Sequence, residues 1–130
     1  MLAQAFDNRA GAEGRGFKAF ARALDLGRVN VAALIVGLAQ AAYDAAAAYV
    51  KQREQFGRPI GSFQGLAMRA ADAFIDVEAL RSVYWEAAWR MTEGLPAAAE
   101  LSVAAWWACS AGRRVTGSAL HMHGGVGQDL

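Results

Sequence analysis

An arginine-bearing segment near the middle of the chain has side chains suited to binding an anion. It reads Lys51-Gln52-Arg53-Glu54-Gln55-Phe56-Gly57-Arg58-Pro59-Ile60-Gly61-Ser62-Phe63-Gln64. A guanidinium presents a planar fork to phosphate oxygens, and the free N–H groups at the start of a following helix favour the same charge. Alternatively, Arg53 and Arg58 are solvated helix ends, with Arg53 complementing a helix dipole. Composition leaves both open, and Ser62 is the expected N-cap of the next helix.

A second cluster combines histidine with glycine near the C-terminus. It reads His121-Met122-His123-Gly124-Gly125-Val126-Gly127. Two histidines at positions i and i+2 do not share one helical face, and no third ligand accompanies them, so we expect no metal site. The glycines either cap and turn a helix or allow a flat ligand to lie against bare backbone.

A third group lies earlier in the chain, in Leu24-Asp25-Leu26-Gly27-Arg28. Asp25 and Arg28 stand three residues apart, so a helix lets them pair, usually for a few tenths of a kcal/mol. Gly27 costs up to about 1 kcal/mol relative to alanine inside a helix, which suggests that something else approaches the backbone there.

Three long helices are predicted to position these residues. Apolar residues recur every three or four positions over residues 17–51, over residues 62–92, and from about Pro96 towards Leu120, ending before Gly124. The residues of the first helix that are spaced for one helical face are Val31, Leu34, Leu38, Ala41, Ala45 and Tyr49. No β-branched run alternates with polar residues, so no sheet is expected. The predicted class is all-α, an up-down bundle of three long antiparallel helices.

Aromatic residues exceed what three helices can bury. Trp85 and Trp89 lie off the main apolar seam of the second helix, and Trp106 and Trp107 are adjacent in the third. This surplus predicts packing against another subunit or against a further segment of the same chain. A helical interaction protein unrelated to any enzyme, with these tryptophans as partner contacts, is the alternative.

Composition excludes several classes of protein. The 130 residues suit one domain, and 55% hydrophobic against 19% charged residues predicts a folded chain. A formal charge of +1 without a basic stripe argues against nucleic acid as a partner. The single cysteine, Cys109, excludes an intramolecular disulfide framework and favours a cytoplasmic setting. Residues 31–50 are about long enough to cross a bilayer, but Gln40, Asp44 and many alanines argue against a membrane span.

Taken in order, the three clusters resemble the C-terminal helical domain of FAD-dependent acyl-CoA dehydrogenases. The resemblance rests on GxxGxGFxxFxxxLDLxR from Gly11 to Arg28, on Tyr49-x-x-x-Arg53-x-x-Phe56-Gly57 with Pro59-Ile60 and Phe63-Gln64 after it, and on His121-x-His123-Gly124-Gly125-x-Gly127. It implies a glycine-rich lead-in over residues 1–16 and the helical domain over 17–130, without the family's final helix. The HxHGGxGxD form at 121–129 is most similar to the actinobacterial branch, in which several members act on sterol side chains and form heterotetramers.

The resemblance implies FAD as cofactor and α,β-dehydrogenation of an acyl-CoA thioester as reaction. The positions that match FAD-contacting residues of the family are Arg53, Glu54, Gln55, Phe56, Phe63, Gln64, His121, Met122, His123, Gly124 and Gly125. The segment from His121 to Gly125 resembles one that approaches FAD bound largely by a neighbouring subunit, so a dimer or tetramer, homomeric or heteromeric, is implied. Asp25 and Arg28 match positions near the acyl-CoA substrate.

No catalytic residue of the family is matched. The glutamate that removes the α-proton in most members lies beyond Leu130, and the position used by a minority matches Gly27, which cannot ionise. The chain is therefore expected to be a domain or fragment that is inactive alone. The alternative is a non-catalytic helical module that completes the site of another dehydrogenase chain.

Overall fold

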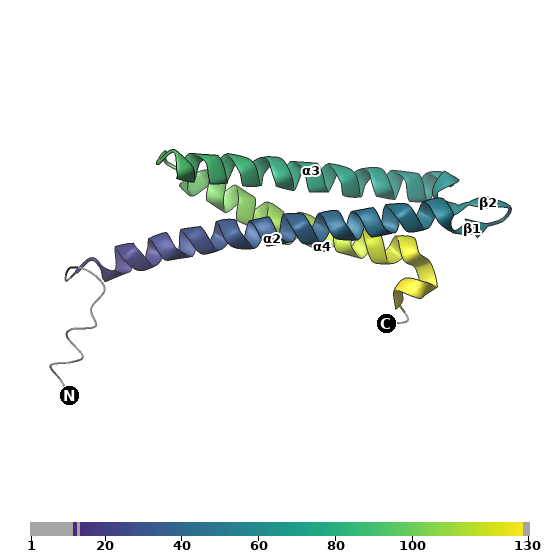
Figure 1. The fold of residues 1–130 in the computed structure, drawn as a ribbon, viewed down its shortest axis with the longest axis horizontal. Coiled ribbons are helices and arrows are strands. Elements are labelled where there is room, and N and C mark those ends of the chain that lie inside the picture. The colour runs from purple at the N-terminus through teal and green to yellow at the C-terminus, as the bar shows by residue number, and fades with distance from the viewer. Residues whose placement is uncertain (1–11, 13, 129–130) are drawn as a thin grey trace, which may run out of the picture.

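Three long helices dominate the computed structural model, which describes residue 12 and residues 14–128 (Figure 1). They are α2 (Gly16–Gln52), α3 (Gln64–Thr92) and α4 (Ala98–His123). Successive helices run in opposite directions, and each packs against the other two. The all-α, up-down architecture is confirmed. Helix α2 begins at the last residue of the expected lead-in, of which residues 1–11 and 13 lie outside the described residues, as does Asp129 of the C-terminal motif.

The connection from α2 to α3 contains a small hairpin. Strand β1 (Glu54–Gln55) pairs antiparallel with β2 (Arg58–Pro59). Phe56 and Gly57 join the strands with φ of 55° and 76°. Positive φ at both central residues is the mark of a type I′ turn, whose twist matches that of paired strands. The expectation of no sheet is therefore wrong at this one place, because two-residue strands are too short to show an alternating pattern.

The hairpin leads into α3 through the short 3-10 helix η1 (Ile60–Ser62). Ser62 is not the N-cap of α3, as predicted, because its hydroxyl donates to the Pro59 carbonyl at 2.7 Å and closes this turn instead. Phe63 occupies the N-cap position without a side-chain cap.

Small side chains line the core where the three helices meet. The buried hydrophobic residues are Ala32, Ala39, Ala46 and Val50 on α2, Ala73, Val77, Leu80 and Ala87 on α3, and Leu101, Ala104, Ala108, Ala111, Val115, Ala119 and Met122 on α4. Alanine at the crossing points allows neighbouring backbones to approach closely, so dense packing is reached with few large side chains.

The buried face of α2 is not the apolar face that the spacing of its residues indicates. Val31, Leu34 and Leu38 are 55%, 72% and 56% exposed. Ala41 and Ala45 are exposed as well, and Tyr49 is half-buried. The core positions on this helix are instead Ala32, Ala39 and Ala46, each one residue after a member of that apolar face, which turns the face by about 100°. The larger residues form an apolar stripe that no other described residue covers.

The aromatic surplus expected from the sequence is present. Trp85, Trp89 and Trp106 are each more than half exposed. Only Trp107 packs partly against the core cluster around Leu80. These side chains leave apolar surface on α3 and α4 as well as on α2.

Helix α2 is the one described helix that is long and apolar enough to cross a membrane by length and composition. A polar residue of this helix, Gln40, joins it to α3. Gln40 Nε2 donates to Asp44 Oδ1 at 2.8 Å, and the Arg81 guanidinium on α3 donates to the Gln40 oxygen.

Candidate functional site

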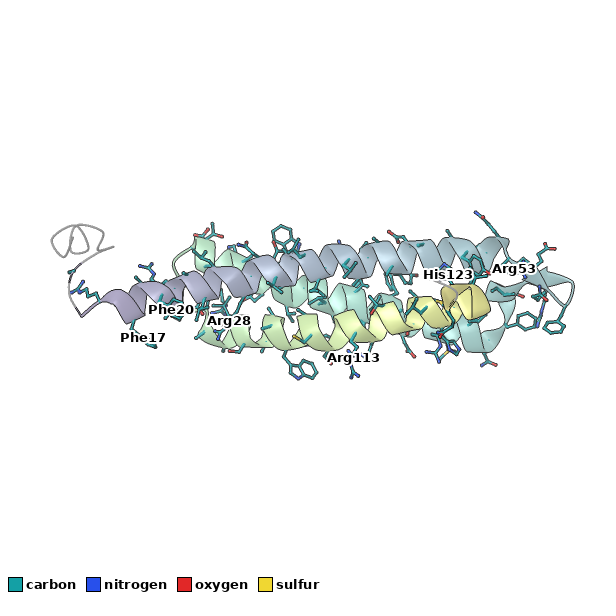
Figure 2. The ribbon with its side chains drawn as sticks, turned by 90° about the horizontal axis from the view of Figure 1, so that it is seen from below. Phe17, Phe20, Arg28, Arg53, Arg113 and His123 are labelled. Atoms are coloured by element: carbon teal, nitrogen blue, oxygen red, sulfur yellow. The ribbon has the colours of Figure 1, made fainter. Side chains whose placement is uncertain are left out.

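Two of the three sequence clusters meet at one end of the bundle. A cavity of about 600 Å³ lies between the end of α2, the hairpin, the start of α3 and the end of α4, where the 3-10 helix η2 (Gly124–Gln128) follows. Arg53 and His123 lie at this end in Figure 2. The cavity is lined by Tyr49, Arg53, Gln55, Phe56, Ile60, Phe63, Leu66, His121, Met122, His123, Gly124, Gly125 and Val126.

Arg53 is held at the cavity by its backbone. Its N–H donates to the Tyr49 carbonyl at 2.9 Å, as the last hydrogen bond of α2, and its carbonyl accepts from the Ile60 N–H at 2.8 Å. At Arg53 the chain turns to extended backbone, with φ −73° and ψ 123°. Within residues 14–128 its guanidinium makes no ion pair or hydrogen bond, so all its donors are free to bind an anion.

Aromatic side chains form the hairpin side of the cavity. The rings of Phe56 and Phe63 meet edge to face, with centroids 6.2 Å apart. Phe56 stands at the tip of the hairpin and is 92% exposed. The Arg58 guanidinium lies 4.0 Å from the centre of the Phe63 ring, so this second arginine is engaged in a cation–π contact and is not on the cavity wall.

The end of α4 contributes ring and backbone surfaces. The His123 ring stacks on Tyr49, with centroids 4.6 Å apart and planes at 28°, and its Nδ1 lies 2.8 Å from the Ala119 carbonyl oxygen. Gly124 ends the helix with φ 62°. Gly125 has no heavy atom within 4 Å of the place where a β-carbon would stand. Gly124 thus ends the helix, and Gly125 presents backbone without a side chain on the cavity wall.

Most residues matched to FAD contacts line this cavity, and two do not. Glu54 in β1 and Gln64 at the start of α3 are exposed outside its walls. Tyr49 also lies on the wall, although it is not among the predicted site residues. Its position one helical turn before Arg53 is the sequence signal that could have identified it.

The third cluster lies on a separate groove between α2 and α4. This groove has a volume of about 620 Å³, and Gly27 and Arg28 line it. Arg28 Nη1 donates to Asp25 Oδ1 at 3.1 Å, which confirms the expected pair, but Asp25 itself is not on the groove wall. No heavy atom lies within 4 Å of a β-carbon position at Gly27, so no described residue makes the expected close approach.

The walls of the groove are apolar and carry no carboxylate. They are formed by Leu24, Gly27, Arg28, Val31, Ala32, Ile35, Leu38, Ala39, Ala105, Ala108, Cys109, Gly112, Arg113 and Thr116. Arg28 lies within α2, and Arg53 directly follows the end of this helix, 25 residues later. At a rise of 1.5 Å per residue, the two residues are about 37 Å apart along the helix axis. Figure 2 shows them towards opposite ends of the bundle. Among the described residues, no three metal-ligating side chains cluster.

Comparison with known proteins agrees with the fold and with the motifs. Residues 14–129 match the family described as acyl-CoA dehydrogenase, C-terminal domain. A probable acyl-CoA dehydrogenase of Bacillus subtilis strain 168, YngJ, is 41% identical over 120 residues, which are 92% of this chain and 32% of that protein.

Two solved structures show the same arrangement of helices. Butyryl-CoA dehydrogenase from Megasphaera elsdenii matches with a TM-score of 0.87 and 40% identity, over 90% of this chain and 30% of that one. A chain of the ChsE4–ChsE5 complex from Mycobacterium tuberculosis matches with a TM-score of 0.78 and 43% identity, over 81% and 29% respectively.

The helical bundle and the matches to known proteins place the molecule among the C-terminal helical domains of acyl-CoA dehydrogenases. The chain belongs to the acyl-CoA dehydrogenase family and corresponds to its C-terminal domain. It spans about a third of the length of these relatives. The family resemblance drawn from the three motifs is confirmed.

Proposed function

We propose that this chain supplies one wall of the FAD site of an acyl-CoA dehydrogenase that performs α,β-dehydrogenation of an acyl-CoA thioester. The observation that carries the proposal is the convergence of the Arg53 segment and the His121–Gly125 segment on one cavity. Arg53 and His121 are 68 residues apart in sequence, and each segment has side chains or backbone suited to part of a dinucleotide.

The residues present suit FAD, the cofactor of this family. The free Arg53 guanidinium suits a diphosphate, since it offers several donors and meets no carboxylate on the cavity wall. Phe56 and Phe63 offer ring surfaces to an aromatic base, and the bare backbone at Gly125 leaves room for a flat group. Bound FAD would accept the hydride that leaves the β-carbon of the thioester.

The separation of the two cavities supports a site shared between subunits. About 37 Å along α2 exceeds the length of an extended FAD, so one molecule at Arg53 does not reach the groove at Arg28 of the same chain. We infer that the Arg53 cavity completes FAD bound largely by a neighbouring subunit. Arg28, with Asp25 bonded to it, belongs to the acyl-CoA end of another active site.

The base that removes the α-proton is proposed to come from elsewhere. Such a base is a carboxylate within hydrogen-bond reach of the α-carbon, and the groove at Arg28 has none on its walls. The same observation favours the second candidate function, a non-catalytic partner chain that completes the site of another dehydrogenase. The two-protein complex among the related structures gives that arrangement a parallel.

The assembly implied is a dimer or tetramer, homomeric or heteromeric. Its contacts would use the apolar stripe of Val31, Leu34 and Leu38 and the exposed tryptophans, which together leave apolar surface on all three helices. An acyl-CoA thioester as substrate, no nucleic-acid partner and a cytoplasmic location complete the proposal.

Titration of the 130-residue chain with FAD, followed by flavin fluorescence, tests this function. We expect saturable binding that Arg53→Ala weakens about 10-fold or more, because hydrogen bonds to a charged group contribute roughly 1.5–3 kcal/mol. Lys51→Ala is the matched control, since it removes a positive charge two residues away that does not line the cavity. Absence of saturable binding, or equal affinity of the Arg53→Ala and wild-type chains, would overturn the proposal.

A further inference from the structure

The His123 ring is held in one orientation by two contacts from different helices. Its Nδ1 lies 2.8 Å from the Ala119 carbonyl oxygen one turn earlier on α4. Its face stacks on Tyr49 of α2, with ring centroids 4.6 Å apart. The stack limits rotation of the ring, and the hydrogen bond fixes which of its edges faces the protein.

These contacts also determine which nitrogen carries the proton. A carbonyl oxygen only accepts hydrogen bonds, so Nδ1 of His123 must be the protonated nitrogen that donates to Ala119. In the neutral ring Nε2 is then left with a lone pair. The ring lines the cavity, and within residues 14–128 Nε2 takes part in no hydrogen bond.

Two other side chains on the cavity wall can accept hydrogen bonds, through the Tyr49 hydroxyl and the Gln55 amide oxygen, but each of them can also donate, so neither requires a donor on the ligand. Arg53 only donates, and His121 is exposed without a contact that fixes its tautomer among the described residues. No carboxylate is on the wall. A phosphate oxygen next to a neutral Nε2 would bring two lone pairs together, so phosphates are better placed at the Arg53 side of the cavity.

We propose that His123 determines ligand specificity by accepting a hydrogen bond at Nε2 from a neutral O–H or N–H donor of the bound nucleotide. The proposal rests on the proposed function, because it assigns a part of the same FAD site. Two groups of the adenosine half carry such donors, the ribose hydroxyls and the adenine amino group. A pocket with a fixed hydrogen-bond acceptor discriminates against ligand analogues that lack the matching donor, since the acceptor is then left unpaired.

The test compares the binding of three small ligands by calorimetry at about pH 8. ADP carries both donors, 2′-deoxy-ADP lacks a ribose hydroxyl, and inosine diphosphate has a carbonyl in place of the amino group. We expect the wild-type chain to bind one of the two analogues about 3–10-fold more weakly than ADP. The weaker analogue identifies the donor.

The variant His123→Phe keeps an aromatic ring to stack on Tyr49 and lacks Nε2. We expect it to bind ADP as weakly as the wild type binds the discriminated analogue, and to bind ADP and that analogue equally. In nitrogen NMR spectra, the free wild-type chain should show His123 protonated at Nδ1, and the Nε2 resonance should shift when ADP is added.

The outcomes separate this proposal from the function on which it rests. No binding of FAD or ADP by the wild-type chain would overturn both. Binding that Arg53→Ala weakens while His123→Phe keeps the wild-type affinities would overturn this proposal alone. A ring protonated at Nε2 in the free chain would also overturn it, whatever the affinities.

Discussion

Gly112 on α4 lies so close to Ile35 on α2 that a β-carbon at position 112 would stand 2.7 Å from Ile35 Cγ2. That methyl group is attached directly to the branched Cβ of Ile35, so it cannot move away without moving the side chain as a whole. Glycine at this position therefore sets how closely α2 and α4 approach. The apolar groove that carries Arg28 has both residues on its wall, so its shape depends on the same crossing.

Gly112→Ala is expected to destabilise the chain although alanine favours helices. Overpacking costs about 1–3 kcal/mol, which offsets the helix propensity gain of about 1 kcal/mol. Gly117→Ala, five residues later on the same helix with open space around it, should instead stabilise by up to about 1 kcal/mol. Urea denaturation of both variants measures the difference. Equal stability of the two would contradict the close crossing.

The turn at the tip of the hairpin holds a phenylalanine in a backbone conformation that suits other residues better. Phe56 has φ of 55°, a region that asparagine adopts more readily. Phe56→Asn, which creates the preferred Asn-Gly pair of a type I′ turn, should raise the free energy of unfolding by up to about 1 kcal/mol. The same variant should bind FAD more weakly, because the ring is lost from the cavity. If FAD affinity is unchanged, the exposed ring has no part in the site.

An ion pair between α3 and α4 is expected to contribute a small, salt-sensitive part of the stability. Arg114 Nε and Nη2 donate to the two oxygens of Asp76 at 2.7 and 2.6 Å. Asp76→Asn should cost about 0.5–1 kcal/mol at low ionic strength and less in high salt, since the Arg114 side chain is partly exposed. Glu78→Gln, which removes a pair within one helix, should cost less. Thermal unfolding of both variants at two salt concentrations provides the comparison.

The pH dependence of this pair follows from the direction of one shift. The hydrogen bond from Arg114 to Asp76 raises the pKa of the arginine above its ordinary value. Because the pKa of Arg114 is higher in the folded than in the unfolded chain, the pair stabilises the fold at every pH below the unfolded-state pKa. This stabilisation is lost only as the pH rises through the folded-state pKa. The contribution of the Arg114 charge to the free energy of unfolding should therefore be constant between about pH 6 and pH 9. A contribution that falls within that window would contradict the pairing.

The apolar stripe of α2 is expected to hold subunits together and not to stabilise the single chain. Leu34→Glu changes a side chain that is 72% exposed, so the free energy of unfolding should fall by no more than about 0.5 kcal/mol. Self-association, measured by sedimentation velocity, should weaken. Ala48→Glu, at another exposed position of the same helix, is the matched control and should associate as the wild type does. A wild-type chain that is monomeric at all concentrations would contradict the assembly.

The three helices could be predicted from sequence because their apolar period is long and nearly unbroken, but the core face of α2 could not. Leu34 and Leu38 are more hydrophobic than Ala32 and Ala39, so a pattern weighted by side-chain size favours the stripe that the structure leaves exposed. Burial at the crossing points selects small residues, because close approach of two backbones leaves no room for leucine. A single sequence does not separate a core face from a face that another subunit covers.

The sequence indicated most of the residues that line the candidate cavity, but it did not indicate how they are arranged in space. Order and spacing of the motifs identified Arg53, Phe63 and the glycine segment, and nine of the eleven proposed FAD contacts line one cavity. That Glu54 points elsewhere follows from the alternation of side chains along β1, a strand too short to be recognised in the sequence. The Tyr49–His123 stack joins residues of two helices, and no local pattern encodes such a contact.

The central claim, that this domain contacts FAD only at its Arg53 end, is tested most directly by amide NMR of the labelled chain with and without FAD. The account predicts resonance shifts confined to residues 49–66 and 119–127, with none around Asp25 and Arg28. Shifts centred on the groove at Arg28, or spread evenly over the three helices, would contradict it.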